Sequence, residues 1–338
     1  MNDCLYEEYT AVGPIKIPEI VGPYRVIRTI GKGSFAIVVL ACHEKTREYV
    51  AIKIISRAEI TNQNVVAYID NEIRLCSRFD HPNIVKVFDV IYKDDVILII
   101  MEYLSNGDLQ TVINRGIYFT FDEQVKVVYQ IMQGLNYLHE RGITHRDLKP
   151  ENILFDDAFH PKLIDFGLSR ERCSMLKTFC GTTLYMAPEV ISGEYYDGLK
   201  ADIWSLGIII HIIGSGSYPF HLVSDPQFIR EIRNGSLEIK NQCRGIIGQL
   251  VDMCLNFDPK ARASTSEMLA LIGQVDIKPF KPVKSKNDRR SLPISSLPKL
   301  VVRANTPLYG IFPTAEEKSN PLPINNRKRR RINLVIPQ

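Results

Sequence analysis

Eight consecutive residues in the middle of the chain place a carboxylate, a cation and an amide side by side. They are His145-Arg146-Asp147-Leu148-Lys149-Pro150-Glu151-Asn152. Asp147 can accept a proton from a hydroxyl, Lys149 can neutralise developing charge, and Asn152 offers an amide oxygen to a hard cation such as Mg2+. These groups suit phosphoryl transfer, which requires a positioned base, counter-charge and a metal holder. A turn held by its own hydrogen bonds is the alternative, so the rest of the chain must supply the missing parts.

A glycine-rich turn and a strand lysine lie upstream of this stretch. Gly31-Lys32-Gly33-Ser34-Phe35-Ala36-Ile37-Val38 lies between two β-patterned runs, which disfavours the strand–turn–helix of a dinucleotide site. Glycines let a backbone approach phosphates closely and present its N–H groups to them. Lys53 ends the apolar run 50–53 and would be costly there without a partner. Glu72, in a helix predicted over 62–79, can be that partner; a plain hairpin and a solvent-facing lysine are the alternatives.

Together these motifs resemble a eukaryotic protein kinase domain. The glycine-rich loop, Lys53, Glu72, the stretch 145–152 and Asp165-Phe166-Gly167 follow one another in that family's order, over about 24–272. The resemblance implies an α+β, two-lobed fold, with a small antiparallel β lobe carrying one helix and a larger, mainly helical lobe. Lys149 is similar to Ser/Thr kinases, and the segments 106–109 and 177–189 look most like the calcium/calmodulin-dependent group, including AMP-activated relatives.

The resemblance also implies a role for each site residue. Lys53, held by Glu72, would position the α- and β-phosphates of ATP. Asp147 would orient and deprotonate the hydroxyl, and Lys149 would lie over the γ-phosphate. Asp165 and Asn152 would hold Mg2+. Asp108 can bond the ribose, although helix N-capping is an alternative for it. The expected nucleotide-binding residues are Ile30, Gly31, Lys32, Gly33, Ser34, Phe35, Ala36, Ile37, Val38, Ala51, Lys53, Met101, Glu102, Leu104, Asp108 and Leu154.

The segment 168–189 is the expected switch. Thr178 stands where many relatives are phosphorylated, and a phosphate there adds about −1.5 to −2 charge. Arg146 could bind that phosphate bidentately, which implies an upstream kinase. The alternative is a loop threonine that only faces solvent. Thr182 is expected to contact Asp147 and Lys149 inside the site instead.

Several further contacts are expected to be structural. The resemblance implies that Asp202 ties an apolar helix, predicted over 201–214, to the backbone of the 145–147 stretch. It also implies a buried pair between Glu189 and Arg262. The last helix of the domain is predicted over Thr265–Ile272.

Three positions depart from the family pattern. Ala36 replaces the third glycine of the phosphate loop, which is tolerated at negative φ. Cys76 stands where leucine is more common, and we expect the smaller side chain to loosen the active position of the helix. Thr183 replaces the usual proline after Gly181-Thr182, which could alter substrate contact. None of the three removes a chemical part of the site.

Composition divides the chain into three regions: an N-terminal leader arm (1–23), a kinase domain (24–274) and a basic, Pro/Ser-rich, disordered tail (275–338). Residues 276–338 carry 14 Lys and Arg against 4 Asp and Glu, whereas residues 1–275 have a net charge of −6. Nine of the 19 prolines lie in this tail, which favours disorder. Its basic run, Arg327–Arg331, could bind an import receptor, an acidic surface or nucleic acid, or could simply be solvated.

The sequence lacks several motifs whose absence bears on the expected compartment. Seven scattered cysteines without a C-x-x-C pair predict neither disulfides nor zinc and fit a reducing compartment. No signal peptide pattern precedes the domain, and the longest apolar runs are too short to span a bilayer. We therefore expect a cytoplasmic protein, with access to the nucleus, that does not bind membrane.

The expected activity is ATP-dependent transfer to protein Ser or Thr. Asp108 and Glu151 favour substrates with basic residues N-terminal to the phosphosite. A catalytically dead scaffold is the first alternative, but it predicts loss of Lys53, Asp147 or Asp165, and all three are present. A nucleic-acid binder is the second, and the acidic body and the lack of interleaved aromatics in the tail disfavour it.

Overall fold

The computed structural model describes the chain from residue 4 to residue 275 with short gaps. The described ranges are 4–9, 14–33, 36–57, 63–171, 175–178, 180–193, 195–221 and 224–275. Ser34, Phe35 and the tail with Arg327–Arg331 lie outside them, so their predicted roles stay predictions. The chain divides into two units, 1–306 and 307–338, and every described residue belongs to the first.

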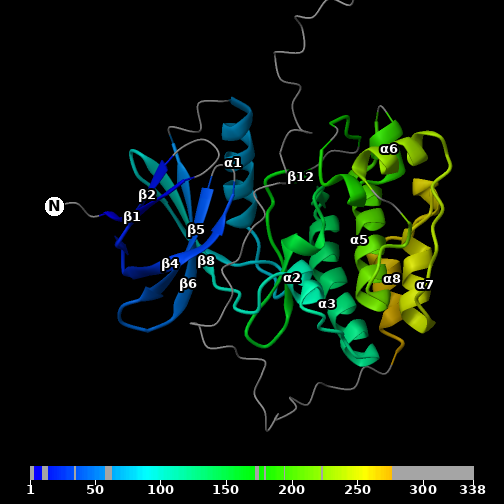
Figure 1. The fold of residues 1–338 in the computed structure, drawn as a ribbon, viewed down its shortest axis with the longest axis horizontal. Coiled ribbons are helices and arrows are strands. Elements are labelled where there is room, and N and C mark those ends of the chain that lie inside the picture. The colour runs from blue at the N-terminus through cyan, green and yellow to red at the C-terminus, as the bar shows by residue number, and fades with distance from the viewer. Residues whose placement is uncertain are drawn as a thin grey trace, which may run out of the picture. The chain divides into compact units, whose positions relative to one another are not determined.

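An antiparallel sheet forms the N-terminal part of the first unit, with its strands in the order β3-β4-β5-β6-β8-β7 (Figure 1). Successive side chains of a strand alternate between the two faces of the sheet. In β6, Val50, Ile52 and Ile54 are buried in a cluster of apolar side chains on one face, the outer core of this sheet. Ala51 and Lys53 line a cavity on the other face. The strands are β3 (Ile20–Val21), β4 (Tyr24–Lys32), β5 (Ala36–His43), β6 (Tyr49–Ser56), β7 (Val87–Tyr92) and β8 (Val96–Glu102).

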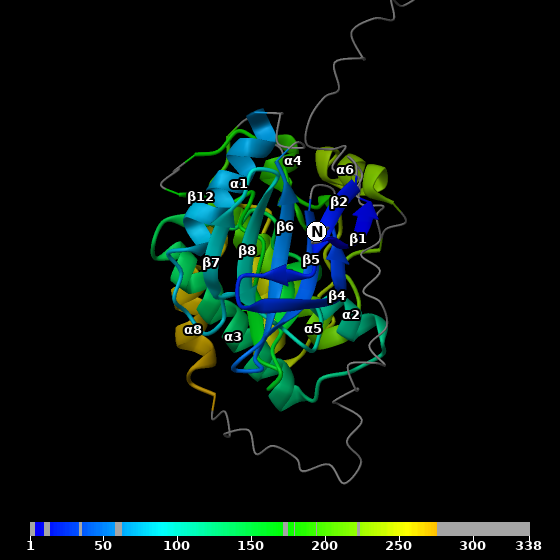
Figure 2. The same ribbon diagram turned by 90° about the vertical axis from the view of Figure 1, so that its left-hand side faces the viewer.

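A further hairpin precedes this sheet, within residues 1–23, for which the sequence predicted a leader arm. Strands β1 (Cys4–Tyr9) and β2 (Pro14–Pro18) pair antiparallel, and both lie beside β4 and β5 in Figure 2. Ile15 and Ile17 are buried in the outer core of the sheet. The alternation in β2 is too short, and too interrupted by proline, to be recognised from sequence alone.

One helix, α1 (Gln63–Cys76), accompanies the sheet, as predicted, although it ends three residues earlier than expected. Figure 1 shows it lying alongside the strands, on the side of β12. Ile69 packs with Ile55 and Ile99 of the sheet. This packing lets the helix present Glu72 toward Lys53 of β6.

The C-terminal part is mainly helical (Figure 1), so the predicted α+β, two-lobed arrangement is confirmed. Its helices are α2 (Leu109–Asn114), α3 (Phe121–His139), α4 (Pro188–Ser192), α5 (Gly198–Ser215), α6 (Asp225–Arg233), α7 (Gly245–Cys254) and α8 (Thr265–Ile272). Short strands β9 (Ile143–Thr144), β10 (Ile153–Phe155), β11 (Pro161–Leu163) and β12 (Arg170–Glu171) lie between α3 and α4. The remaining short elements are the 3-10 turns η2 (Pro150–Asn152), η3 (Thr183–Tyr185) and η4 (Pro259–Ala261).

Helix α5 is the central element of this helical part. It is long and apolar enough to cross a membrane by composition, but 72% of it is buried within the fold, as expected for a core helix that is apolar nearly all round. Asp197 caps its start by accepting from the Leu199 backbone N–H at 2.9 Å, and Gly216 ends it at a left-handed φ of 77°. The helix is therefore a rigid support for the loop segments that its polar side chains bind.

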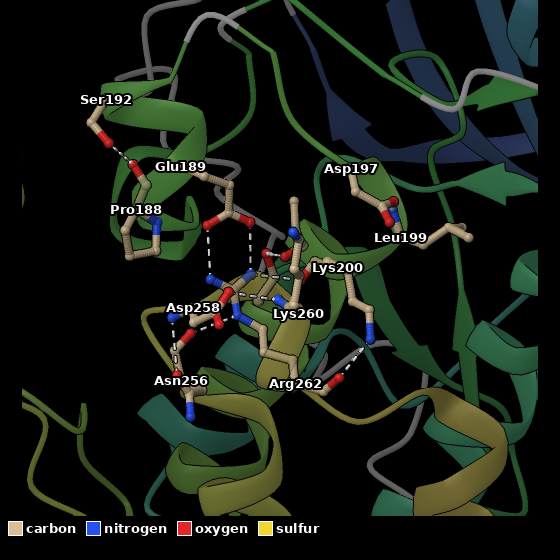
Figure 3. Close-up of polar contacts among 12 residues, drawn as sticks. Pro188, Glu189, Ser192, Asp197, Leu199, Lys200, Asn256, Asp258, Lys260 and Arg262 are labelled. Carbon is tan, nitrogen blue, oxygen red and sulfur yellow. Dashed lines mark hydrogen bonds and ion pairs between the residues drawn. The ribbon is translucent and has the colours of Figure 1, made fainter.

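A buried ion pair ties this core to helix α4 (Figure 3). Arg262 donates from both terminal nitrogens to the two carboxylate oxygens of Glu189, each at 2.7 Å. Two further donors reach the carbonyls of Asn256 at 2.7 Å and Lys200 at 2.8 Å. The pair expected from the sequence is present, and these contacts use four of the five N–H groups of its arginine.

Candidate active site

The stretch 145–152 is held in place by the core helix beneath it. Asp202 of α5 is 1% exposed and accepts from the backbone N–H groups of His145 at 2.7 Å and Arg146 at 2.8 Å. This is the tie expected from the sequence. Arg146 adopts a left-handed φ of 69°, which costs energy for a residue other than glycine. The two charge-assisted hydrogen bonds that these N–H groups donate to the buried carboxylate stabilise that turn.

Asp147 lies at the centre of a hydrogen-bonded cluster. Its Oδ2 accepts from the Lys149 ammonium at 2.7 Å, and its Oδ1 accepts from both the backbone N–H and the hydroxyl of Thr182, at 3.0 and 2.9 Å. Lys149 also donates to the Thr182 hydroxyl at 2.9 Å. Burial opposes the charge on Lys149, but the Asp147 carboxylate outweighs it and raises the lysine pKa. The cluster therefore keeps an ammonium and a carboxylate together.

Asn152 is oriented by the same carboxylate. Its amide nitrogen donates to the Asp147 carbonyl at 2.8 Å and to the Asp147 carboxylate at 3.1 Å. Because the nitrogen is committed to these acceptors, the amide oxygen is directed elsewhere, as a metal-ligating oxygen must be. The residue is 5% exposed, so this orientation is held by packing as well.

Lys53 of β6 and Glu72 of α1 form the expected ion pair, which joins the helix to the sheet. The ammonium donates to the two carboxylate oxygens at 2.6 and 2.7 Å. Burial acts against the lysine charge, but Glu72 and Asp165 outweigh it and raise the Lys53 pKa. Burial likewise raises the pKa of Glu72, against the stabilising charge of Lys53. A buried pair of this kind fixes the position of both side chains.

Between the sheet and the helical part lies a cavity of about 240 Å³. Its walls include Glu72 and Asp165, so the ion pair and the expected metal ligand open onto the same space. Nine of the expected nucleotide-binding residues line it: Ile30, Val38, Ala51, Lys53, Met101, Glu102, Leu104, Asp108 and Leu154. A cavity that is mostly apolar, with a few convergent charged groups, is typical of a small-molecule site.

Other expected residues do not line this cavity. Gly31, Lys32 and Gly33 lie at the turn beyond it, where the Gly33 N–H donates to the Ala36 carbonyl at 2.8 Å. Ala36 is 8% exposed and packs with Ile55 of the sheet. Ile37 is fully buried in the outer core, so its side chain cannot contact a ligand here. Strand alternation places the Val38 side chain on the cavity face and that of Ile37 on the opposite face, so a contact of Ile37 with a nucleotide would come from its backbone and stays a prediction.

The cavity also has walls that were not predicted from the sequence. Arg28 and Ile99 each stand two residues before an expected wall residue on the same strand, so strand alternation could have found them. Ile164 precedes Asp165 directly. Arg115 follows α2 and had no sequence signal, since only the packing of that helix brings it to the cavity. The missed wall residues are Arg28, Cys76, Val85, Val87, Ile99, Tyr103, Ser105, Asn106, Gly107, Thr111, Arg115 and Ile164.

Asp108 has the helix-capping role that was one of its two expected roles. Its carboxylate accepts from the Thr111 backbone N–H at 2.7 Å and from the Thr111 hydroxyl at 2.8 Å. Each oxygen has accepted one bond and has a second lone pair, and the residue also lines the cavity. Capping is therefore compatible with a contact to a ligand hydroxyl.

Thr178 lies beside Arg146, as the expected switch requires. The Thr178 carbonyl accepts from the Arg146 guanidinium and from the Tyr196 hydroxyl, both at 2.9 Å. The threonine itself is exposed. Among the residues that the structure describes, the buried Nε of Arg146 has no hydrogen-bond partner. The guanidinium therefore lies against the Thr178 backbone, and its unpartnered nitrogen is buried.

Comparison with known proteins agrees with this geometry. The family described as "Protein kinase domain" matches residues 24–271. The chain is 38% identical to "SNF1-related protein kinase catalytic subunit alpha KIN12" of Arabidopsis thaliana, over 75% of this chain and 51% of that protein. It is 36% identical to "Serine/threonine protein kinase OSK3" of Oryza sativa subsp. indica, over 72% of this chain and 49% of that protein.

A third relative is "CBL-interacting serine/threonine-protein kinase 8" of Arabidopsis thaliana, 36% identical over 73% of this chain and 56% of that protein. The chain therefore spans about half the length of the curated relatives it matches. These relatives agree with the predicted similarity to the group that includes AMP-activated kinases. With a family match over 24–271 and a Lys53–Glu72 pair facing Asp165 across one cavity, the chain belongs to the protein kinase family.

Proposed function

We propose that this chain is an ATP-dependent serine/threonine protein kinase that transfers the γ-phosphoryl group to protein hydroxyls. One observation carries the proposal: Lys149 and Thr182 both bond the Asp147 carboxylate. Asp147 is thus a base whose two carboxylate oxygens are held in position and whose negative charge is offset by Lys149. Phosphoryl transfer depends on such positioning and electrostatics more than on covalent chemistry.

In the proposed reaction, Asp147 accepts the proton of the substrate hydroxyl. Lys149 stays cationic, since Asp147 raises its pKa, and offsets the negative charge on the transferring group. Lys53, fixed by Glu72, binds the α- and β-phosphates from the opposite wall. The side chains of Ala51, Met101 and Leu104 supply an apolar space for the adenine.

The residues present fit Mg2+. Asn152 has its amide oxygen directed away from Asp147, and Asp165 supplies a carboxylate on the cavity wall. Mg2+ is usually bound by one or two such oxygen ligands together with substrate phosphates. When bound, the ion would neutralise charge on the phosphates. Asn152 and Asp165 are therefore the proposed metal-holding residues.

The substrates we propose are proteins with basic residues N-terminal to the phosphosite. Asp108 lies at the cavity wall, and Glu151 is exposed, two residues after Lys149. Carboxylates in these positions attract an arginine or lysine of a peptide. Lys149 favours Ser and Thr over Tyr, by the family resemblance.

Regulation by an upstream kinase at Thr178 is part of the proposal. The exposed threonine and the nearby Arg146 support it, because the guanidinium already contacts the Thr178 carbonyl and could turn to bond a phosphate at Thr178. We further propose a cytoplasmic protein that enters the nucleus through an import receptor bound to Arg327–Arg331. Loss of nuclear signal on tail truncation, with unchanged DNA retention in vitro, would separate import from nucleic-acid binding.

The test is transfer of radiolabelled phosphate from ATP to a peptide library by the wild type and by Asp147→Asn. We expect transfer to Ser and Thr peptides with upstream basic residues, and a loss of at least about 10³-fold in Asp147→Asn. No transfer by a protein phosphorylated on Thr178 would favour a scaffold that does not catalyse. Preference for acidic or proline-directed peptides would refute the substrate proposal alone.

A further inference from the structure

Helix α1 contacts the segment after Asp165 through a polar stripe that the mechanism above does not use. Asn71 and Arg74 are three residues apart in the helix, so they share one face of it, and Arg78 lies in the turn just after its end at Cys76. This face meets residues 166–171. Glu72 points instead toward Lys53, so α1 touches the site in two separate places.

Asn71 makes the closest of these contacts. Its amide nitrogen donates to three backbone carbonyls, those of Phe166 at 3.2 Å, Gly167 at 3.3 Å and Ser169 at 2.8 Å. An amide has two N–H groups, so one of them is shared between neighbouring carbonyls. The Asn71 oxygen accepts from Arg74 at 3.1 Å, which fixes the nitrogen on the side of the carbonyls.

The conformation of Asp165 explains why such a contact matters. Asp165 has a left-handed φ of 63°, which is strained for a residue other than glycine and persists only when its surroundings determine it. The carbonyls held by Asn71 belong to residues within the four that follow Asp165. Holding them restricts the peptide planes through which Asp165 would relax.

Glu171 secures the other end of the same segment. It accepts from Arg74 at 2.6 Å and from both terminal nitrogens of Arg78 at 3.0 and 3.1 Å. The side-chain hydrogen bonds of Arg78 and Arg74 lower the Glu171 pKa to about 2. Glu171 also pairs in β12 with Ile143 of β9, the strand that leads into the stretch 145–152.

We propose that Asn71 is a positioning residue for phosphoryl transfer, which holds Asp165 in its left-handed conformation through the carbonyls of residues 166–169. Arg74, Arg78 and Glu171 hold the helix face against that segment. The inference rests on the proposed kinase activity for its kinetic readout.

The main test is Asn71→Asp, compared with Asn234→Asp on the exposed end of α6. The carboxylate keeps the size of the side chain and can still pair with Arg74, but it has no N–H to donate and repels three carbonyls. We expect kcat with Mg-ATP to fall roughly tenfold or more, with only a small fall in the midpoint of unfolding and an unchanged Kd for adenosine. Adenosine carries no phosphate and needs no metal, so it reports the adenine wall alone.

Hydrogen exchange supplies a readout that does not depend on activity. In phosphatase-treated protein we expect the amides of residues 166–171 to exchange faster in Asn71→Asp than in wild type, with no change in Asn234→Asp. Glu171→Gln should show a smaller increase in the same segment. If the wild type transfers no phosphate, the activity proposal fails while this comparison still decides the positioning role.

Two results would overturn the inference. One is equal exchange of residues 166–171 in wild type and Asn71→Asp. The other is a fall in kcat that is accompanied by a matching loss of adenosine affinity and of thermal stability, since that pattern describes a damaged fold rather than a misplaced Asp165.

Discussion

Neutralising Glu189 tests how far the buried ion pair of Figure 3 stabilises the fold. The Arg262 side chain is 0% exposed and that of Glu189 is 15% exposed, so solvent screens the pair weakly. Glu189→Gln removes the negative charge but leaves one acceptor oxygen. Arg262 also keeps its two backbone carbonyls. Glu189→Gln should therefore lower the free energy of unfolding by about 3 kcal/mol, the lower end of the range for breaking a buried ion pair.

Thermal unfolding followed by tryptophan fluorescence measures this cost locally. Trp204 is the only tryptophan of the chain, is fully buried, and lies 5.1 Å from the Arg262 guanidinium, measured to its ring centroid. For a domain of this size, about 3 kcal/mol corresponds to a fall of roughly 6–12 °C in the midpoint.

Glu238→Gln is the matched control. Glu238 and Lys240 form an ion pair at 3.4 Å in which both side chains are mostly exposed, and such pairs contribute less than about 1 kcal/mol. Its midpoint should stay within a degree or two of the wild type. Equal shifts for the buried and the exposed variant would refute the assignment of Glu189 as a structural residue.

Two further perturbations follow from single positions. The folded pKa of Glu171 is depressed, so the stability that this carboxylate contributes should be constant at neutral pH and be lost as pH falls from about 4.5 toward 2. The unfolding midpoints of wild type and Glu171→Gln should therefore differ at pH 7 and converge near pH 2. A difference that stays constant over this range would contradict the assignment. Gly181→Ala should lower both stability and transfer rate, since the position has φ 111° and a Cβ would lie 2.7 Å from the Arg146 carbonyl. Gly235→Ala, with φ 66° and open space around it, should cost only about 1–2 kcal/mol of backbone strain and leave transfer unchanged; equal losses would argue against the steric clash.

Local sequence patterns are sufficient to predict most of the chemistry. Asp147, Lys149 and Asn152 lie within six residues of one another, so their proximity needs no long-range packing. Residue types then limit the reaction, because a carboxylate, a lysine and an amide oxygen together suit phosphate and Mg2+. The last helix, Thr265–Ile272, is also predicted with its observed bounds, since its apolar period is regular.

Long-range relations were accessible only where a family pattern supplied them. The Lys53–Glu72 and Glu189–Arg262 pairs were expected from the resemblance, and the structure adds their distances and burial. The glycine-rich motif marks a stretch of backbone, whereas strand alternation decides which of its side chains face the cavity, so Val38 lines it and the Ile37 side chain does not.

What the sequence determined by itself was therefore the set of reactive groups and the order in which they occur. Tertiary structure alone decided that β1 and β2 form a hairpin beside the sheet, that Arg115 reaches the cavity, and that Asn71 meets the carbonyls after Asp165. Each of these depends on which faces of separate elements pack together. A neutral amide contacting carbonyls almost a hundred residues away leaves no period, charge pattern or motif in the sequence, so only the folded chain reveals it.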